Sequence, residues 1–220
     1  MKLRLMVMLI ATAFVLFTAP AWATNVGFDF SQNGNGHLTN TAGCTGSGFG
    51  CVEFFDSSHT YELDITGFSS NGHENDLYFK NSACCAGTEV GLGLNSTTDN
   101  EVNFGTQFLQ LNVAKLFAAG ATSLIIGGNS TTAGESWGIF YSNIDGTRGS
   151  TLAASGSSGG TFTTVSTGSS TYLDFASLNA NGGGDVLATS TPVPEPTTLW
   201  LLGSGFLGLG GMYRRKRLVA

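Results

Sequence analysis

Basic residues are scarce in this chain, and most of them lie at its two ends. Of nine Lys and Arg among 220 residues, six fall before residue 24 or after residue 192. Residues 24–192 keep Lys80, Lys115 and Arg148 against fourteen Asp and Glu, a formal charge of −11 with His neutral. Such a surface repels nucleic acid and anionic lipid and keeps a protein in solution. The charge balance therefore argues against nucleic acid as a partner.

Histidine is also scarce, which limits catalytic chemistry. His37, His59 and His73 are too scattered for an H-E-x-x-H zinc site, and no His follows them. Residues 156–160 read Gly-Ser-Ser-Gly-Gly and match G-x-S-x-G. A hydrolase nucleophile in that motif needs a strand before it, a helix after it, and a later acid and His. We therefore interpret residues 156–160 as a loop.

Paired carboxylates are the remaining route to catalysis. Glycosidases use two acids that can come from any strands, and Glu62, Glu89 and Glu101 are candidates by strand position. Their alternation with apolar residues predicts that they face solvent instead. We expect no enzyme.

Apolar and polar residues alternate with a period of two through much of residues 24–190, and this alternation predicts strands. Clusters of Gly, Asn, Ser and Thr separate the strand candidates, as turns require. Only Val113 to Ala119 has the pattern of a helical turn, and Ala154 to Gly160 is interpreted as a long hairpin loop. The predicted strands are 26–30, 61–65, 76–80, 90–94, 107–113, 123–127, 137–141, 161–166, 171–176 and 185–189.

Many short strands with no βαβ rhythm predict an all-β fold, a single antiparallel β-sandwich of jelly-roll type. The length of residues 24–190 allows one core. Trp137, in phase with Ile139 and Tyr141, is expected to pack in that core.

Four cysteines, Cys44, Cys51, Cys84 and Cys85, are candidates for disulfides in an oxidising compartment. A bond between adjacent Cys84 and Cys85 would be strained, so we favour each of them bonding to Cys44 or Cys51. The alternatives are a Cys44–Cys51 bond beside a redox-labile vicinal pair, and a four-thiolate zinc site. The C-x₂₋₄-C spacing typical of zinc is missing.

Acidic loops offer oxygen ligands of the kind that calcium takes. Glu74 and Asp76 form one cluster, and Asp99 and Glu101 form another. Asp and Asn in turns also bond to their own backbone without any metal. We keep calcium as a hypothesis and expect no other cofactor.

The N-terminus has the three parts of a signal peptide at residues 1–23. Lys2 and Arg4 are positive, residues 5–17 are apolar, and Ala21-Trp22-Ala23 is an A-x-A cleavage site with Ala21 and Ala23 as its small residues. The mature chain is expected to begin at Thr24.

The C-terminus has three features in a fixed order. Residues 191–198 form a linker that contains Val193, Pro194, Glu195 and Pro196, and residues 199–213 are apolar and uncharged. A helix is the one way for such a single segment to cross a membrane, with some local thinning of the bilayer. Residues 214–220 follow, and the cations expected to stay cytoplasmic are Arg214, Arg215, Lys216 and Arg217.

These three features resemble the PEP-CTERM sorting signal. The resemblance implies a substrate of exosortase, a membrane-embedded processing enzyme of Gram-negative envelopes, which would cut near Pro194-Glu195-Pro196. The same segment is also described as an "ice-binding protein C-terminal" region, a name that implies nothing about ice here. More loosely, residues 75–80, 91–94 and 99–101 resemble β-sandwich ectodomains joined to such tails.

We therefore expect a protein exported through the inner membrane, briefly anchored by its C-terminal helix, and then placed at the cell surface or outside the cell. The expected role is structural or adhesive, in a biofilm matrix with exopolysaccharide as partner. A carbohydrate-binding, lectin-like module that uses calcium is the alternative, and a glycan-active hydrolase is the third hypothesis.

Overall fold

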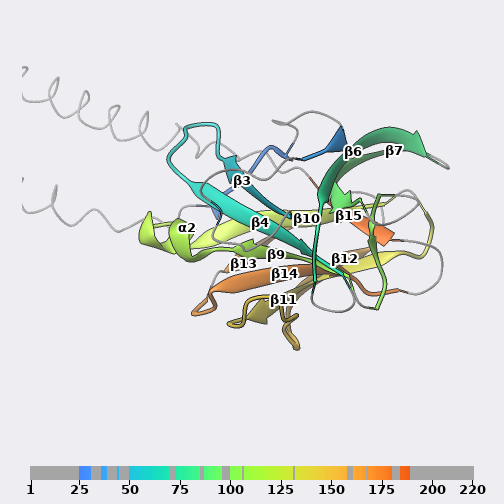
Figure 1. Ribbon diagram of the computed structural model, residues 1–220. Coiled ribbons are helices and arrows are strands. Elements are labelled where there is room, and N and C mark those ends of the chain that lie inside the picture. The colour runs from blue at the N-terminus through green and yellow to red at the C-terminus, as the bar shows by residue number, and fades with distance from the viewer. Residues whose placement is uncertain are drawn as a thin grey trace, which may run out of the picture.

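The computed structural model describes most of the predicted ectodomain. The described residues are 25–30, 36–38, 44, 50–69, 73–84, 87–95, 100–105, 107–130, 132–157, 161–166, 168–179 and 184–188. Within them the chain is mostly β-strand and forms two sheets (Figure 1). The predicted all-β class is confirmed, whereas the jelly-roll connectivity stays a prediction.

The first sheet has eight strands in the order β1-β10-β15-β7-β6-β2, with β13 paired to β10 and β8 paired to β15. All its pairs are antiparallel except β1 with β10. Its strands are β1 (Asn25–Val26), β2 (Gly36–His37), β6 (Leu77–Cys84), β7 (Gly87–Leu94), β8 (Val102–Asn103), β10 (Ser123–Asn129), β13 (Thr161–Ser166) and β15 (Gly184–Ala188).

The second sheet has seven strands in the order β12-β11-β14-β9-β4-β3, with β5 paired to β4, and all its pairs are antiparallel. Its strands are β3 (Cys51–Phe55), β4 (Glu62–Phe68), β5 (Glu74–Asn75), β9 (Phe108–Asn112), β11 (Ser136–Ser142), β12 (Thr151–Ser157) and β14 (Tyr172–Ser177).

The two sheets share one hydrophobic core. On β4, Leu63 and Ile65 are fully buried in it, and Leu92 of β7 and Leu124 of β10 join the same cluster from the other sheet. Successive side chains of a strand point to opposite faces. Asp64, between Leu63 and Ile65 on β4, therefore lies on the outer face of the seven-stranded sheet.

Trp137 joins the two sheets, and its predicted place in the core is confirmed by an exposure of 0%. A Cβ on Gly128, in the facing sheet, would lie 2.2 Å from the Trp137 ring, and one on Gly156, in the neighbouring β12, would lie 2.4 Å from it. The indole therefore needs glycine at both positions.

Most of the predicted strands are present, with ends that shift by a few residues. Three predictions are wrong. The strand expected over 26–30 is limited to Asn25–Val26, although Phe28 and Phe30 still enter the core. Residues 154–157 of the expected hairpin loop belong to β12, and β3 and the two-residue strands β2, β5 and β8 form in segments for which no strand was expected.

One helix, α2 (Ala114–Ala118), is described, where the helical turn was predicted. It lies at the opposite end of the molecule from the β6–β7 hairpin (Figure 1). No helix among the described residues is long and apolar enough to cross a membrane. The predicted signal peptide with Ala21 and Ala23, and the predicted membrane helix at 199–213, lie outside the described residues.

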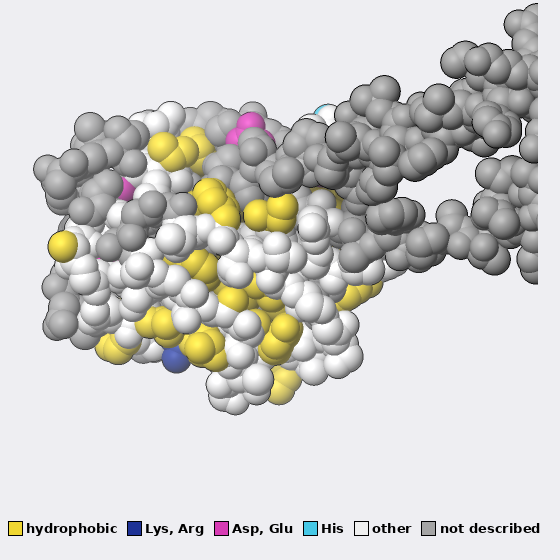
Figure 2. Space-filling view, turned by 180° about the vertical axis from the view of Figure 1, so that it is seen from behind, with side chains coloured by type: hydrophobic (Ala, Val, Ile, Leu, Met, Phe, Trp, Pro, Cys, Tyr) yellow, Lys and Arg dark blue, Asp and Glu magenta, His cyan; other side chains and the backbone are white. Residues whose placement is uncertain are grey.

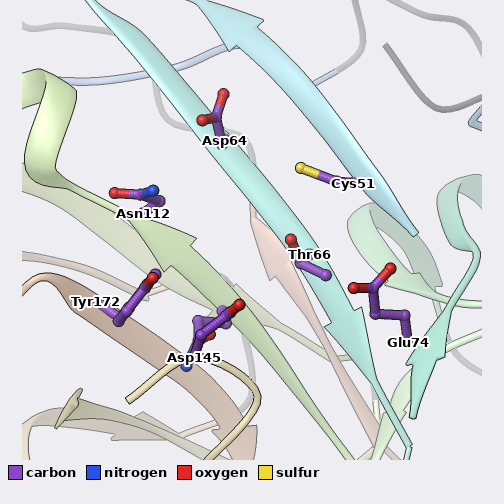
Figure 3. A pocket seen from close by; sticks show the side chains of 8 residues that line it. Cys51, Asp64, Thr66, Glu74, Asn112, Asp145 and Tyr172 are labelled. Atoms are coloured by element: carbon purple, nitrogen blue, oxygen red, sulfur yellow. The ribbon is translucent and has the colours of Figure 1, made fainter. Parts of the chain in front are cut away.

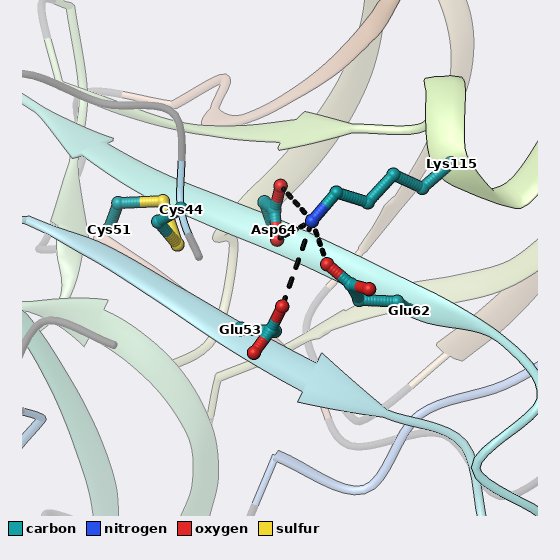
Figure 4. Close-up of a disulfide and its surroundings, with 6 residues drawn as sticks. All are labelled: Cys44, Cys51, Glu53, Glu62, Asp64 and Lys115. Carbon is teal, nitrogen blue, oxygen red and sulfur yellow. Dashed lines mark hydrogen bonds and ion pairs between the residues drawn. A yellow bond between two sulfur atoms is a disulfide. The ribbon is translucent and has the colours of Figure 1, made fainter. Parts of the chain in front are cut away.

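A disulfide joins Cys44 to Cys51 (Figure 4). The favoured bond of these cysteines to Cys84 or Cys85 is therefore wrong, and so is a zinc site of all four thiolates. The reason lies in the topology, because Cys51 lines the outer face of the seven-stranded sheet, whereas β6, which ends at Cys84, belongs to the other sheet. The alternative weighed from the sequence, a local bond across seven residues, is the one that forms.

Candidate functional site

The outer face of the seven-stranded sheet contains a small polar pocket (Figure 3). No Lys or Arg is among its lining residues. Carboxylates, amides and one phenol dominate the lining, which is the mixture that binds polar, hydroxyl-bearing ligands. The lining residues are Cys51, Asp64, Thr66, Glu74, Gln110, Asn112, Asp145 and Tyr172.

Three of these side chains form a row across neighbouring strands. Asp64 of β4 is opposite Asn112 of β9, which is opposite Tyr172 of β14. Side chains directly opposite in an antiparallel pair lie about 5 Å apart at their Cβ atoms. The sheet therefore presents an acid, an amide and a phenol as one continuous polar surface.

The loop after β11 brings a further carboxylate, that of Asp145, to the pocket. Gln110 holds this loop: its Nε2 donates to the carbonyl of Ile144 at 3.2 Å, and its Oε1 accepts from the amide of Gly146 at 3.0 Å. Asp174 adds a bond from the amide of Gly149 at 2.7 Å. Gln110 and Asp174 thus fix the backbone on both sides of Asp145.

Beside the pocket, Lys115 of α2 lies among the carboxylates of Glu53, Glu62 and Asp64 (Figure 4). Its Nζ is 3.1 Å from Oδ2 of Asp64 and 3.6 Å from Oε1 of Glu53, and it contacts Glu62. One oxygen from each carboxylate lies within 4.8 Å of the others, a spacing that would also suit a metal ion. The ammonium group of Lys115 already occupies the position between the three carboxylates that a metal ion would take.

Burial changes the acidity of the pocket. It raises the pKa of Asp64 to about 6, and repulsion from Glu53 adds to the shift. Burial, with the charge of Asp145, also raises the pKa of Tyr172, so its hydroxyl stays protonated and can donate a hydrogen bond. Within the described residues, Oε2 of Glu74 is buried and accepts no hydrogen bond. A ligand that carries donors would satisfy it.

A second charged cluster lies on the eight-stranded sheet. Lys80 is 4% exposed, and its Nζ contacts Glu101 and lies 2.5 Å from Oε2 of Glu89. The expectation that Glu89 and Glu101 face solvent is wrong, because the backbone at Asn100 packs over the sheet. A Cβ on Gly93 would lie 2.1 Å from the carbonyl oxygen of Asn100, so only glycine permits this approach.

Burial alone would lower the pKa of Lys80, but hydrogen bonds and charge from Glu101 and Glu89 outweigh it and raise that pKa. The lysine therefore stays charged, and the cluster is an ion pair network that fastens one loop to the sheet. Its burial leaves no room for a substrate.

The expected calcium ligands are not brought together in the described part of the chain. Glu74 lines the pocket, whereas Glu101 is in the buried cluster on the other sheet. Asp99 lies outside the described residues, and Asp76 lies between β5 and β6. Calcium at these positions stays a prediction.

Sequence reasoning missed the pocket residues Asn112, Asp145 and Tyr172, and also Glu53 with Lys115. Glu53, Asn112 and Tyr172 lie on strands whose apolar alternation places them on the outer face, and that phase was a usable signal. Asp145 lies in the loop after β11 and Lys115 in α2, where strand alternation gives no signal. The phase does not tell which strands become neighbours.

The C-terminal residues match a known family. Residues 192–216 match the PEP-CTERM protein-sorting motif. The resemblance inferred from Pro194-Glu195-Pro196 and the basic end is thus confirmed, although both lie outside the described residues. The motif marks an exported protein that an exosortase-type enzyme processes and sorts toward the cell surface. No curated protein and no solved structure matches the chain.

Proposed function

We propose that this chain is an adhesive protein of the extracellular matrix whose β-sandwich binds exopolysaccharide in the pocket on its seven-stranded sheet. A signal peptide exports it, the C-terminal helix anchors it during transit, and processing places it in the matrix. The sandwich is of the jelly-roll type in this proposal. The sorting motif supports the route, and the pocket supports the ligand class.

The observation that carries the proposal is the row of Asp64, Asn112 and Tyr172 beneath Asp145. An amide offers two donors and an acceptor, a carboxylate accepts, and a protonated phenol can do both. Adjacent sugar hydroxyls need the same alternation of donors and acceptors. A tyrosine ring adds an apolar face on which a sugar ring can stack.

The charges narrow the class of polysaccharide. Of the three cations in residues 24–192, Lys80 is buried and Lys115 holds three carboxylates. Arg148 is exposed, with its guanidinium carbon 5.4 Å from the centre of the Phe140 ring. A domain of charge −11 with one exposed cation repels a uronic acid polymer. We propose a neutral or amine-bearing polymer.

Binding without catalysis is part of this proposal. Asp64, the most buried carboxylate of the pocket, and its neighbours Glu53 and Glu62 are all paired with Lys115, so this group of acids offers no free general acid or base. A hydrolase remains the competing hypothesis, and release of oligosaccharides from the polymer on incubation would support it.

The test is calorimetry of the processed chain, purified from its producing cell, with that cell's own exopolysaccharide. Saturable binding that persists in chelator is expected. Lack of binding to the polymer in either calcium or chelator would contradict the proposal and leave a purely structural role. Loss of binding in chelator alone would favour the calcium-dependent lectin.

Calcium has one specific place to be tested, the cluster of Glu53, Glu62 and Asp64. The carboxylates suit the ion, but Ca²⁺ takes six to eight oxygens and would have to displace Lys115. Replacing Lys115→Met should leave three carboxylates in mutual repulsion. If calcium then raises the melting temperature of the variant but not of the wild type, the lysine is the resident cation.

A further inference from the structure

Among the described residues, strand β13 forms one edge of the eight-stranded sheet. It pairs with β10 along all six residues, from Thr161 with Gly128 to Ser166 with Ser123, without a bulge. Among the described residues no strand pairs with its other side. Exposed edges present unpaired backbone donors and acceptors, and proteins commonly block them with charges, proline or bulges. β13 has none of these.

The composition of this edge differs from that of the rest of the domain. Residues 149–173 contain no charged side chain, although residues 24–192 carry a charge of −11. β13 reads Thr-Phe-Thr-Thr-Val-Ser, in which five of the six residues have high β-propensity and none is proline or glycine. Figure 2 shows a face of the molecule on which few charged side chains are visible among the described residues.

Exposure along β13 follows the pleat. Val165 is buried in the core, whereas Phe162 is 48% exposed, and Thr164 and Ser166 are also exposed. A row of side chains on the outer face therefore flanks a backbone edge, at whose end the carbonyl of Ser166 accepts a hydrogen bond of 3.0 Å from the hydroxyl of Tyr141. The aromatic ring of Phe162 would lose much of its exposed surface if another strand lay beside it.

We infer that the free edge of β13 pairs with β13 of a second copy of this chain, and so joins two sandwiches through one continuous sheet. Two copies of this acidic domain repel each other over most of their surfaces, and the uncharged edge of β13 is where that repulsion is absent. A second copy can therefore approach this edge, and it is the partner that we infer. Antiparallel pairing of a strand with itself about a twofold axis is self-complementary. The affinity comes from backbone hydrogen bonds, as in other strand additions.

The pleat leaves two central registers for such a pair. Residues that oppose each other must lie on the same face, so the twofold axis passes either Thr163 or Thr164. In the first register Phe162 of one copy faces Thr164 of the other, and in the second it faces Ser166. A residue on the twofold axis faces the same residue of the other copy.

The test uses that last property in the full-length chain, expressed in its producing cell. Thr163→Cys and Thr164→Cys are oxidised mildly and run on a non-reducing gel, with Thr147→Cys, an exposed loop residue, as the matched control. One of the two β13 variants should run mostly as a dimer that reduction dissolves, while the control and the wild type stay monomeric. Adding Phe162→Lys to that variant should remove the dimer, because each copy then places a charge against Thr164 or Ser166 on the uncharged edge of the other.

Two results would overturn the inference. In one, neither β13 variant forms the dimer. In the other, Thr147→Cys forms the disulfide-linked dimer to the same extent, which would show that the dimers arise from random collisions between molecules. Neither result bears on polysaccharide binding, which uses the other sheet.

Discussion

The Nε2 of Gln110 on β9 donates a hydrogen bond of 2.9 Å to Oδ1 of Asp174 on β14, and both side chains are at most 2% exposed. The pair lies opposite each other across the two strands. Each residue also bonds to the backbone of the loop that carries Asp145. A buried pair thus connects the sheet to the loop in the pocket wall and fixes the position of the Asp145 carboxylate.

Replacing Gln110→Ala should lower the free energy of unfolding by about 2–3 kcal/mol, since it leaves the buried Asp174 oxygen and loop groups without partners. Urea unfolding of the purified chain measures this loss. Gln107→Ala, whose side chain accepts a part-buried bond from the amide of Asn103, is the control and should cost about 1 kcal/mol. Equal losses for both variants would contradict the proposed role of Gln110.

The stability should depend on pH through Asp174. Burial raises the pKa of this carboxyl from 3.8 to about 6, despite bonds from Gly149 and Gln110 and the charge of Arg148. A raised folded-state pKa means that the folded chain binds this proton more tightly than the unfolded chain does. The stabilisation from this proton is therefore fully present below pH 3.8 and is lost as the pH rises through about 6. The shift corresponds to about 3 kcal/mol.

Asp174→Asn removes this titration. The difference in unfolding free energy between wild type and variant should therefore change by up to about 3 kcal/mol between acidic and neutral pH, in favour of the wild type at low pH. Asp64 also has a raised pKa, but it contributes the same pH dependence of the unfolding free energy to the wild type and to the variant. Its contribution therefore cancels in the difference between them. A difference that stays constant with pH would contradict the assignment.

Lys80→Met should be among the most damaging single changes, because it leaves Glu89 and Glu101 buried without a cation. A loss of about 3–5 kcal/mol is expected at neutral pH, and acid should recover part of it as the carboxyls take up protons. Lys115→Met is the comparison variant, since the Lys115 side chain is 36% exposed although its partner Asp64 is 3% exposed; its loss should be about 1–3 kcal/mol, smaller than that of Lys80→Met. Thermal melts at two pH values separate the two variants.

Most of the strands could be predicted from the local alternation of apolar and polar residues. Along Tyr61 to Ile65 and Trp137 to Tyr141, every second side chain lies in the core or packs against it, so apolar residues recur with a period of two in the sequence. β12 carries no such pattern, because Leu152 is half exposed and the neighbouring positions are alanine, serine and glycine. It forms because β11 offers a partner edge, which local sequence does not encode.

The pocket could be predicted far less well than the strands. Asp64 and Asn112 meet through the pairing of β4 with β9, and Asn112 and Tyr172 through that of β9 with β14. Such neighbours are set by long-range register, whereas the sorting motif is contiguous and was readable directly. The cysteine pairing failed for the same reason, since the sheet assignment of β3 and β6 decides it.

The sorting motif makes a separate prediction. Replacing Pro194→Ala and Glu195→Ala together should leave the C-terminus uncut, so that the intact mass of the chain reaches Ala220. The matched control is Thr197→Ala with Thr198→Ala, next to the motif, which should be processed as the wild type is. A double motif variant cut as efficiently as the wild type would show that these two residues do not direct processing.

The most direct test of polysaccharide binding in the pocket is a titration of the processed chain that carries Asn112→Ala and Tyr172→Phe. Both changes remove polar groups from the row without altering the core, and Ser58→Ala with Thr60→Ala, in the β3–β4 turn, serves as the control. We expect the pocket variant to lose binding to the producing cell's exopolysaccharide while its melting temperature stays close to that of the control. Unchanged affinity in the folded pocket variant would contradict the account.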